Sequence, residues 1–141
     1  IGFFQYYPSY IVDYIVSNTV GELLKDKTPE DVNNLKILDP ACGSGSFLLG
    51  AYDFLLNYHL TYYLENKDFA IKTNKIYEKG NNDYSLTFDE KKKILLNNIY
   101  GVDIDSGAIE VTKLSLILKL LENETQDLIK KLKNHILPDL S

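Results

Sequence analysis

The chain has 141 residues, enough for one domain with a single core, and 45% hydrophobic with 25% charged residues is typical of a soluble globular protein. Its one cysteine excludes an internal disulfide, and no apolar run reaches the roughly 20 residues that span a bilayer, so we expect a cytoplasmic protein without a membrane partner. The net charge of −5 disfavours strong DNA binding by this chain alone, because phosphate neutralisation supplies most non-specific affinity.

The first third of the chain predicts a helix, a polar link, a strand and a second helix. Residues 8–25 carry apolar side chains at helical spacing. The stripe expected to be buried is Ile11, Ile15, Val16, Val20, Leu23 and Leu24. Residues 26–31 form the link, with room for a short helical turn, and residues 36–39 form the strand. The second helix covers 46–65, and its expected inward residues are Phe47, Leu48, Ala51, Leu55 and Tyr58.

The middle of the chain predicts a polar loop, then a helix, then a second strand. Residues 66–85 are rich in Asn, Lys and Asp and show no sustained period, so we expect an exposed insertion or loop there. Thr87 and Glu90 then form a capping-box pattern, which predicts a helix from there to about residue 96. The apolar residues that follow predict a second strand over 99–104.

Two further helices are predicted after this strand. Residues 106–122 are apolar on more than one face, which predicts a helix that lies between the sheet and another layer. A last helix is predicted over 124–135. The basic triplet 91–93 lies among acidic residues and asparagines, and we interpret it as a solvated helix face.

The most informative stretch joins the first strand to the helix that follows it. An apolar run ends in Asp39, turns through Gly43-Ser44-Gly45 and continues as an amphipathic helix. This order is typical of a doubly wound α/β sheet, where nucleotide-like ligands bind beyond the carboxyl end of the strand. Glycines let the backbone approach a ligand closely, and the helix offers unpaired N–H groups. No Gly-Lys-Ser/Thr follows, which excludes a P-loop.

This stretch resembles the cofactor loop of the S-adenosylmethionine-dependent, adenine-specific DNA methyltransferases. The resemblance is carried by Asp39, Pro40, Ala41, Cys42, Gly43, Ser44, Gly45 and Phe47. It implies a Rossmann-like α/β fold, here an incomplete parallel sheet with flanking helices, and S-adenosylmethionine bound by these residues. Cys42 has no adjacent base that would mark a nucleophile, so we expect a small, semi-buried loop residue.

A second candidate site lies at the end of the second strand. In doubly wound nucleotide folds an acid at this place accepts hydrogen bonds from the ribose hydroxyls. We assign this role to Asp103, with Ile104 on the adenine face. The interval after Gly45 is longer than usual, and the polar segment 66–85 with the capped helix accounts for it. Asp105 is better explained as a cap of the next helix.

The N-terminal aromatic residues resemble a third part of the family's cofactor site. There, an aromatic-Thr-Pro segment lies over the methionine part of the cofactor, which implies this place for Tyr6, Tyr7 and Pro8. The threonine is missing in this chain, and Tyr7 or Ser9 is its candidate substitute. A purely structural alternative, that Pro8 starts a helix at its first position, explains the proline but not the aromatic cluster.

The order of these segments resembles the adenine methylases of type IIG and type I restriction–modification enzymes. Their catalytic Asn/Asp-Pro-Pro-Tyr/Phe motif is absent, because the prolines stand only at positions 8, 29, 40 and 138. We therefore expect residues 1–141 to be a single partial domain, the N-terminal, cofactor-binding part of a methylase domain. We expect no catalytic residue, no metal site and no methyl transfer by the chain alone.

The leading hypothesis is a fragment of a site-specific adenine DNA methyltransferase that binds S-adenosylmethionine. Its implied partners are the remainder of the methylase domain, a target-recognition domain and, through the whole enzyme, DNA. The alternatives are a methyltransferase that acts on RNA or on protein glutamine, and a non-catalytic nucleotide-binding module.

Overall fold

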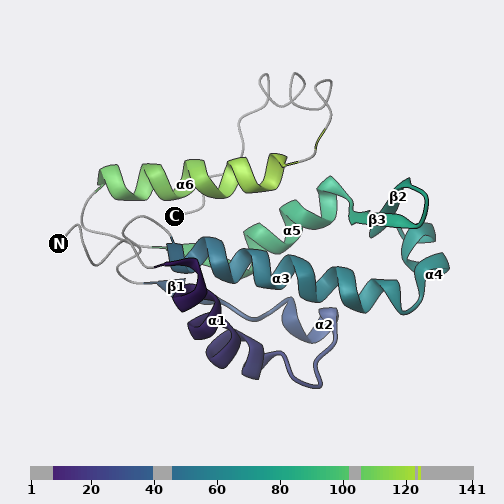
Figure 1. Ribbon diagram of the computed structural model, residues 1–141, viewed down its shortest axis with the longest axis horizontal. Coiled ribbons are helices and arrows are strands. Elements are labelled where there is room, and N and C mark those ends of the chain that lie inside the picture. The colour runs from purple at the N-terminus through teal and green to yellow at the C-terminus, as the bar shows by residue number, and fades with distance from the viewer. Residues whose placement is uncertain (1–7, 40–45, 102–105, 123, 125–141) are drawn as a thin grey trace.

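The computed structural model describes residues 8–39, 46–101, 106–122 and 124. The described elements, in chain order, are α1 (Ser9–Leu23), α2 (Pro29–Val32), β1 (Ile37–Asp39), α3 (Ser46–Leu64), α4 (Lys67–Lys72), β2 (Ile76–Gly80), β3 (Asp83–Leu86), α5 (Phe88–Asn98), β4 (Ile99–Gly101) and α6 (Ser106–Leu121). Helix α3 runs through the middle, with α1 and α2 on one side of it and α5 and α6 on the other (Figure 1). The architecture is therefore mixed α/β around a central helix.

Strands β1 and β4 form a parallel pair, as the sequence predicts. Ile37 lies opposite Ile99, and Asp39 lies opposite Gly101. Two segments some sixty positions apart therefore end at the same edge of a small parallel sheet. The predicted continuation of the second strand over 102–104 lies outside the described residues.

Helix α3 forms the centre of the core. Leu48, Ala51 and Leu55 are fully buried, which confirms three of its five predicted inward residues. Phe47 and Tyr58 are only half-buried. The sequence analysis missed Tyr52 and His59, which are also buried. A helix covered on several sides buries residues around its circumference, so one apolar stripe cannot identify all of them.

Helix α1 packs against α3 along a valine row rather than along the predicted stripe. Its buried residues follow a spacing of four, and they are Val12, Val16, Val20 and, just after the helix, Leu24. Ile15 is 37% exposed and Leu23 is 56% exposed, so their predicted burial is wrong. Both lie off the row that faces α3, and the apolar content of a window cannot determine which residues face the partner helix.

The predicted turn in the polar link is present as α2. Thr28 caps it: its hydroxyl accepts from Asp31 N at 3.4 Å, and its own N–H donates to the Asp31 carboxylate at 2.9 Å. The hydrogen bonds that the Asp31 carboxylate accepts from the Thr28 N–H and hydroxyl lower the pKa of Asp31. The reciprocal pair satisfies two N–H groups that a helix start otherwise leaves unpaired.

The expectation of a loop over residues 66–85 is wrong, because the segment contains α4 and an antiparallel β2–β3 hairpin. Asn66 caps α4 by accepting from Phe69 N. Asn82 turns the hairpin with a φ of 55°, a conformation that asparagine tolerates better than most residues. Ala70, Ile76 and Leu86 are buried, but in the sequence they stand among exposed Lys, Asn and Asp residues, which conceal the short strands.

Helix α5 begins after Thr87, as the capping pattern predicts. The Thr87 hydroxyl accepts from Glu90 N at 3.3 Å and donates to Asn74 O at 2.9 Å, so it also joins α5 to the end of the α4 segment. The helix continues to Asn98, two residues beyond the predicted end.

The basic triplet is only partly solvated. Lys93 is exposed, but Lys91 is 7% exposed, so the prediction fails for this residue. Its amine pairs with Glu124 and also donates to Glu122 O at 3.3 Å. A buried lysine needs such a partner, since an unpaired charge is costly away from water. Lys91 therefore fastens the end of α6 onto α5.

Helix α6 buries one face only. Leu116 and Leu120 are buried, whereas Val111, Leu114 and Leu118 are 54%, 57% and 60% exposed. The predicted position between two layers is therefore wrong for the described residues, and the last predicted helix over 124–135 lies outside them apart from Glu124. Although α6 is strongly apolar, no helix among the described residues is long and apolar enough to cross a membrane.

Candidate functional site

The candidate site is the edge where β1 and β4 end. Asp39 is the last residue of β1, is half-buried, and lies opposite Gly101, the last residue of β4. The carboxyl ends of parallel strands form the crevice in which open α/β sheets bind ligands. The structure therefore places the ends of the two segments that the sequence singles out side by side.

Two helices begin at this edge. The N-terminal ends of α1 and α3 lie beside β1 in Figure 1, whereas α6 begins on the same side of the molecule but in the layer above them. Helix starts carry unpaired N–H groups and a partial positive charge. The starts of α1 and α3 therefore make the edge suited to a ligand with anionic or hydrogen-bond-accepting groups.

Two glycines hold α1 close to α3, and of the two Gly50, in the second turn of α3, lies nearer this edge. A Cβ added at Gly50 would lie 2.6 Å from Cγ1 of Val12, closer than real Cβ atoms approach. A Cβ at Gly21 would lie 3.1 Å from the ring of Phe54. The earlier residue of α1 meets the earlier residue of α3, and the later meets the later. The two helices therefore run in the same direction, and their N-terminal ends lie on the same side of the molecule. Gly50 therefore fixes how near the start of α1 lies to the start of α3.

An asparagine behind the sheet aligns the two strands. The Asn98 amide, 1% exposed, donates to Val32 O at 2.8 Å and to Leu35 O at 2.6 Å. The Lys36 amine donates to Asn97 O at 2.7 Å. These bonds join the end of α5 to the segment before β1, which supports the register of β1 with β4. Nothing in the sequence distinguishes Asn98 from neighbouring asparagines, so its role was not predicted.

The structure describes only part of the predicted cofactor-binding set. Pro8 is exposed and is the N-cap of α1, which begins at Ser9. Asp39 ends β1, and Phe47 lies half-buried in the first turn of α3, packed against the core. The other predicted residues lie outside the described part of the chain; they are Tyr6, Tyr7, Pro40, Ala41, Cys42, Gly43, Ser44, Gly45, Asp103 and Ile104.

The opposite end of α3 carries a buried polar network. The Tyr63 hydroxyl donates to the Glu90 carboxylate, whose other oxygen lies 3.6 Å from the Lys75 amine. Burial, together with the bond to Glu90, raises the pKa of Tyr63 above its ordinary value. Burial lowers the pKa of His59, whose Nδ1 lies 2.7 Å from Leu55 O. This network joins α3 to α5 and to the start of β2.

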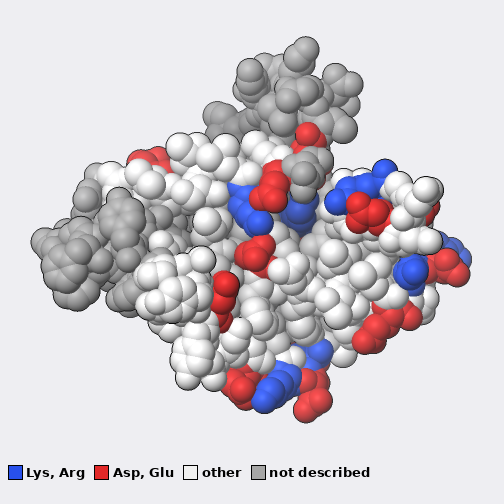
Figure 2. Space-filling model, in the orientation of Figure 1, with Lys and Arg blue, Asp and Glu red and all other residues white. Residues whose placement is uncertain are grey.

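Charge is interleaved on the visible face. Figure 2 shows acidic and basic side chains alternating along the centre and right of this face, without a basic stripe. A group of paired charges joins α6 to α3: the Lys119 amine lies 3.0 Å from the Asp53 carboxylate and 3.1 Å from the Glu122 carboxylate. Across the described residues, no group of three or more His, Cys, Asp or Glu is placed to hold a metal ion.

Comparison with known proteins identifies similar sequences over most of the chain. The family described as "MmeI, DNA-methyltransferase domain" matches residues 18–140. The Escherichia coli type II restriction enzyme and methyltransferase RM.Eco57I is 38% identical over 133 residues, which cover 94% of this chain and 13% of the relative.

Two further relatives agree in kind. The putative type II restriction enzyme and methyltransferase RM.MjaORFECS2P of Methanocaldococcus jannaschii is 38% identical over 72% of this chain and 7% of its own length. The adenine-specific methyltransferase BrxX of Escherichia coli is 30% identical over 79% of this chain and 10% of its own length. The chain thus spans a small share of each of these relatives.

Proposed function

The chain belongs to the family of the MmeI DNA-methyltransferase domain, and on this premise we propose that it forms the S-adenosylmethionine-binding part of a site-specific adenine DNA methyltransferase of a restriction–modification system. One observation carries the proposal: β1 and β4 are parallel and end side by side, with α3 starting at the same edge. We propose that β1–α3 and β4–α6 are strand–helix units of a Rossmann-like sheet.

The chemistry of this edge fits S-adenosylmethionine. The cofactor carries a carboxylate, which suits the N–H groups at the start of α3. It also carries an ammonium and a sulfonium, for which the Asp39 carboxylate at the end of β1 is a fitting neighbour. The glycines in the sequence Asp39–Gly45 allow the backbone to approach the cofactor without steric conflict from a Cβ.

The remaining roles are assigned by position in the sequence. We propose that Asp103 accepts hydrogen bonds from the ribose hydroxyls and that Ile104 packs on the adenine ring. Tyr6, Tyr7 and Pro8 would cover the methionine part, and this agrees with the position of the start of α1 beside the strand ends. The half-buried Phe47 would anchor the first turn of α3 to the core beneath the cofactor.

When bound, S-adenosylmethionine supplies an electrophilic methyl group for transfer to the exocyclic amino group of adenine. The part proposed for this chain is to bind and orient the cofactor, because the 141 residues contain no Asn/Asp-Pro-Pro-Tyr/Phe motif. The relatives' names, two restriction enzyme–methyltransferases and an adenine-specific methyltransferase, favour adenine in DNA over RNA or protein glutamine. DNA, the remainder of a methylase domain and a target-recognition domain are the proposed partners.

Calorimetric titration with S-adenosylhomocysteine tests the proposal. We expect the wild-type protein to bind it and Asp103→Ala to lose about tenfold or more in affinity, since hydrogen bonds to a charged group contribute roughly 1.5–3 kcal/mol each. The control is Asp83→Ala, an exposed carboxylate at the start of β3. If Asp105→Ala, and not Asp103→Ala, lowers the affinity, Asp105 is the residue that accepts hydrogen bonds from the ribose. No binding by the wild-type protein would contradict the proposed function.

A further inference from the structure

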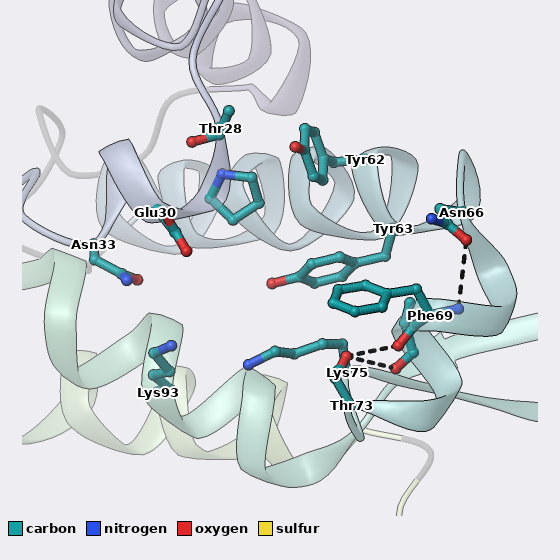
Figure 3. A pocket seen from close by; sticks show the side chains of 12 residues that line it. Thr28, Glu30, Asn33, Tyr62, Tyr63, Asn66, Phe69, Thr73, Lys75 and Lys93 are labelled. Atoms are coloured by element: carbon teal, nitrogen blue, oxygen red, sulfur yellow. Dashed lines mark hydrogen bonds between the residues drawn. The ribbon is translucent and has the colours of Figure 1, made fainter.

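A hollow of about 460 Å³ lies at the C-terminal end of α3, away from the strand edge, between α2, α4 and α5 (Figure 3). Small-molecule sites in proteins have volumes of about 300–1,000 Å³ and combine apolar walls with a few convergent polar groups. This hollow has both features. Its aromatic side is formed by Tyr62, Tyr63 and Phe69, and charged groups come from Glu30, Lys75 and Lys93.

The aromatic side offers flat surfaces to a planar ligand. Phe69 is 61% exposed and Tyr62 is 40% exposed, although both border a hollow. The rings of Tyr63 and Phe69 extend from α3 and α4 into the same space in Figure 3. Tyr63 is held by its hydroxyl bond to Glu90, and its ring meets that of Tyr62 edge-on at 6.1 Å. The Tyr63 ring is thus held in place before any ligand arrives.

The charged side offers one acceptor and one uncompensated donor. Lys75 is paired with Glu90 at 3.6 Å, so its charge is largely balanced. Glu30 on α2 and Lys93 on α5 lie across the hollow from the aromatic rings and on the same side as each other in Figure 3. No ion pair is recorded for either of them within the described ranges. A carboxylate only accepts hydrogen bonds, and an ammonium only donates them.

We propose that this hollow binds the guanine base of a nucleoside or nucleotide. Guanine presents two adjacent N–H donors beside a carbonyl acceptor on one edge. The donors match the two oxygens of Glu30, and the carbonyl matches the amine of Lys93. The faces of the base stack on the aromatic side, an interaction that every base can make. Adenine lacks the paired donors and the carbonyl, so the charged groups discriminate where the rings do not.

Binding of purine monophosphates tests the inference. Calorimetry is done on the purified protein with saturating S-adenosylhomocysteine present, which keeps the strand-edge site filled and the two proposals distinguishable. We expect GMP to bind about fivefold or more tightly than AMP, as for a matched bidentate edge contact. IMP, which lacks the amino group at position 2, is expected to lie between them. No binding of GMP at millimolar concentration, or equal affinity for GMP and AMP, overturns the proposal.

Matched variants assign the binding to this hollow. Phe69→Ala is expected to weaken GMP binding about fivefold or more through lost stacking, whereas Ile71→Ala, an exposed apolar change on the same helix that does not line the hollow, is expected to have no effect. Lys93→Gln is expected to weaken GMP binding, whereas Lys72→Gln, which does not line the hollow, is expected to have no effect. Glu30→Gln is expected to reduce the preference for GMP over AMP. Equal behaviour of the hollow variants and their controls overturns the assignment.

Discussion

The two ends of α3 are built in different ways. At its start, Gly50 admits close packing of α1, and the N-terminal ends of α1 and α3 lie beside β1. At its end, the buried Glu90 carboxylate accepts from the Tyr63 hydroxyl and pairs with the Lys75 amine, beside the buried His59. About 28 Å of helix, for its 19 residues, separates the two regions.

This difference indicates a division of roles. Backbone N–H groups and glycines form a surface to which a ligand can be fitted closely, and the proposed cofactor site is of this kind. A satisfied network of buried polar side chains instead rigidifies and specifies packing. Changes at the start of α3 are therefore expected to affect cofactor binding, and changes at its end are expected to affect stability.

The largest effect is expected for Glu90→Ala. Glu90 is 5% exposed and holds both the Tyr63 hydroxyl and the Lys75 amine. Removing one partner of a buried ion pair destabilises by roughly 3–5 kcal/mol, and because Lys75 is 32% exposed we expect about 3 kcal/mol, measured by urea unfolding. Affinity for S-adenosylhomocysteine should stay unchanged while the protein is folded.

The matched control for Glu90→Ala is Asp89→Ala, one position earlier on the same helix. Asp89 is exposed in the first turn of α5, where its charge contributes under about 1 kcal/mol through the helix dipole. Similar destabilisation by both variants would show that the network contributes little. Loss of cofactor affinity in Glu90→Ala would contradict the division of roles.

A smaller loss of stability, with a loss of binding, is expected for Gly50→Val. The added side chain meets Val12, since even a Cβ would lie 2.6 Å from its Cγ1. Overpacking of this kind destabilises by typically 1–3 kcal/mol. Displacement of α1 should also weaken binding of S-adenosylhomocysteine in the same calorimetric assay.

Gly80→Val serves as the comparison for Gly50→Val, because a Cβ at Gly80 meets no atom within 4 Å. It introduces the same side chain into open space in the hairpin, and we expect neither stability nor binding to change appreciably. If Gly50→Val lowers stability but leaves binding intact, then the close approach of α1 serves packing alone.

The parts of the fold that the sequence predicted depend on strong local signals. The β1–β4 pair follows from two apolar runs that each precede a helix, and the start of α5 follows from the capping pattern at Thr87. The hairpin was missed because its buried residues, such as Ile76 and Leu86, are few and isolated among polar ones. A short strand pair of this kind is stabilised by its contacts with the rest of the fold rather than by its own pattern.

The two candidate sites also differ in how much of each is formed by residues that are close together in the sequence. The strand-edge site could be proposed from the sequence because its residues are contiguous near Asp39 and near Gly101. The hollow could not, because Glu30, Phe69 and Lys93 come from α2, α4 and α5, and they border one space only when these helices pack around the end of α3. The prediction that Lys91 is solvated was wrong for a related reason. Its partner, Glu124, lies far along the chain and is brought near by α6.

The smallest effect is expected from the protonation of His59. Burial holds the pKa of His59 below its ordinary 6.5, so the unfolded chain binds a proton on this residue first as the pH falls. The stability that the neutral ring contributes is therefore present above pH 6.5 and is lost as the pH falls through the folded-state pKa. Titration of this one group changes the free energy of unfolding by at most about 1.4 kcal/mol per pH unit.

Urea unfolding at pH 7.5 and 5.5 measures this contribution. His59→Gln keeps a donor for Leu55 O but cannot titrate, so its free energy of unfolding should fall less on acidification than that of the wild type. His135→Gln removes the chain's other histidine and leaves His59 in place, so it should keep the larger fall. An equal fall in the wild type and in His59→Gln would mean that His59 takes up its proton in the folded state as readily as in the unfolded chain. Because His59 lies at the end of α3 remote from the strand edge, affinity for S-adenosylhomocysteine should respond to pH equally in all three proteins.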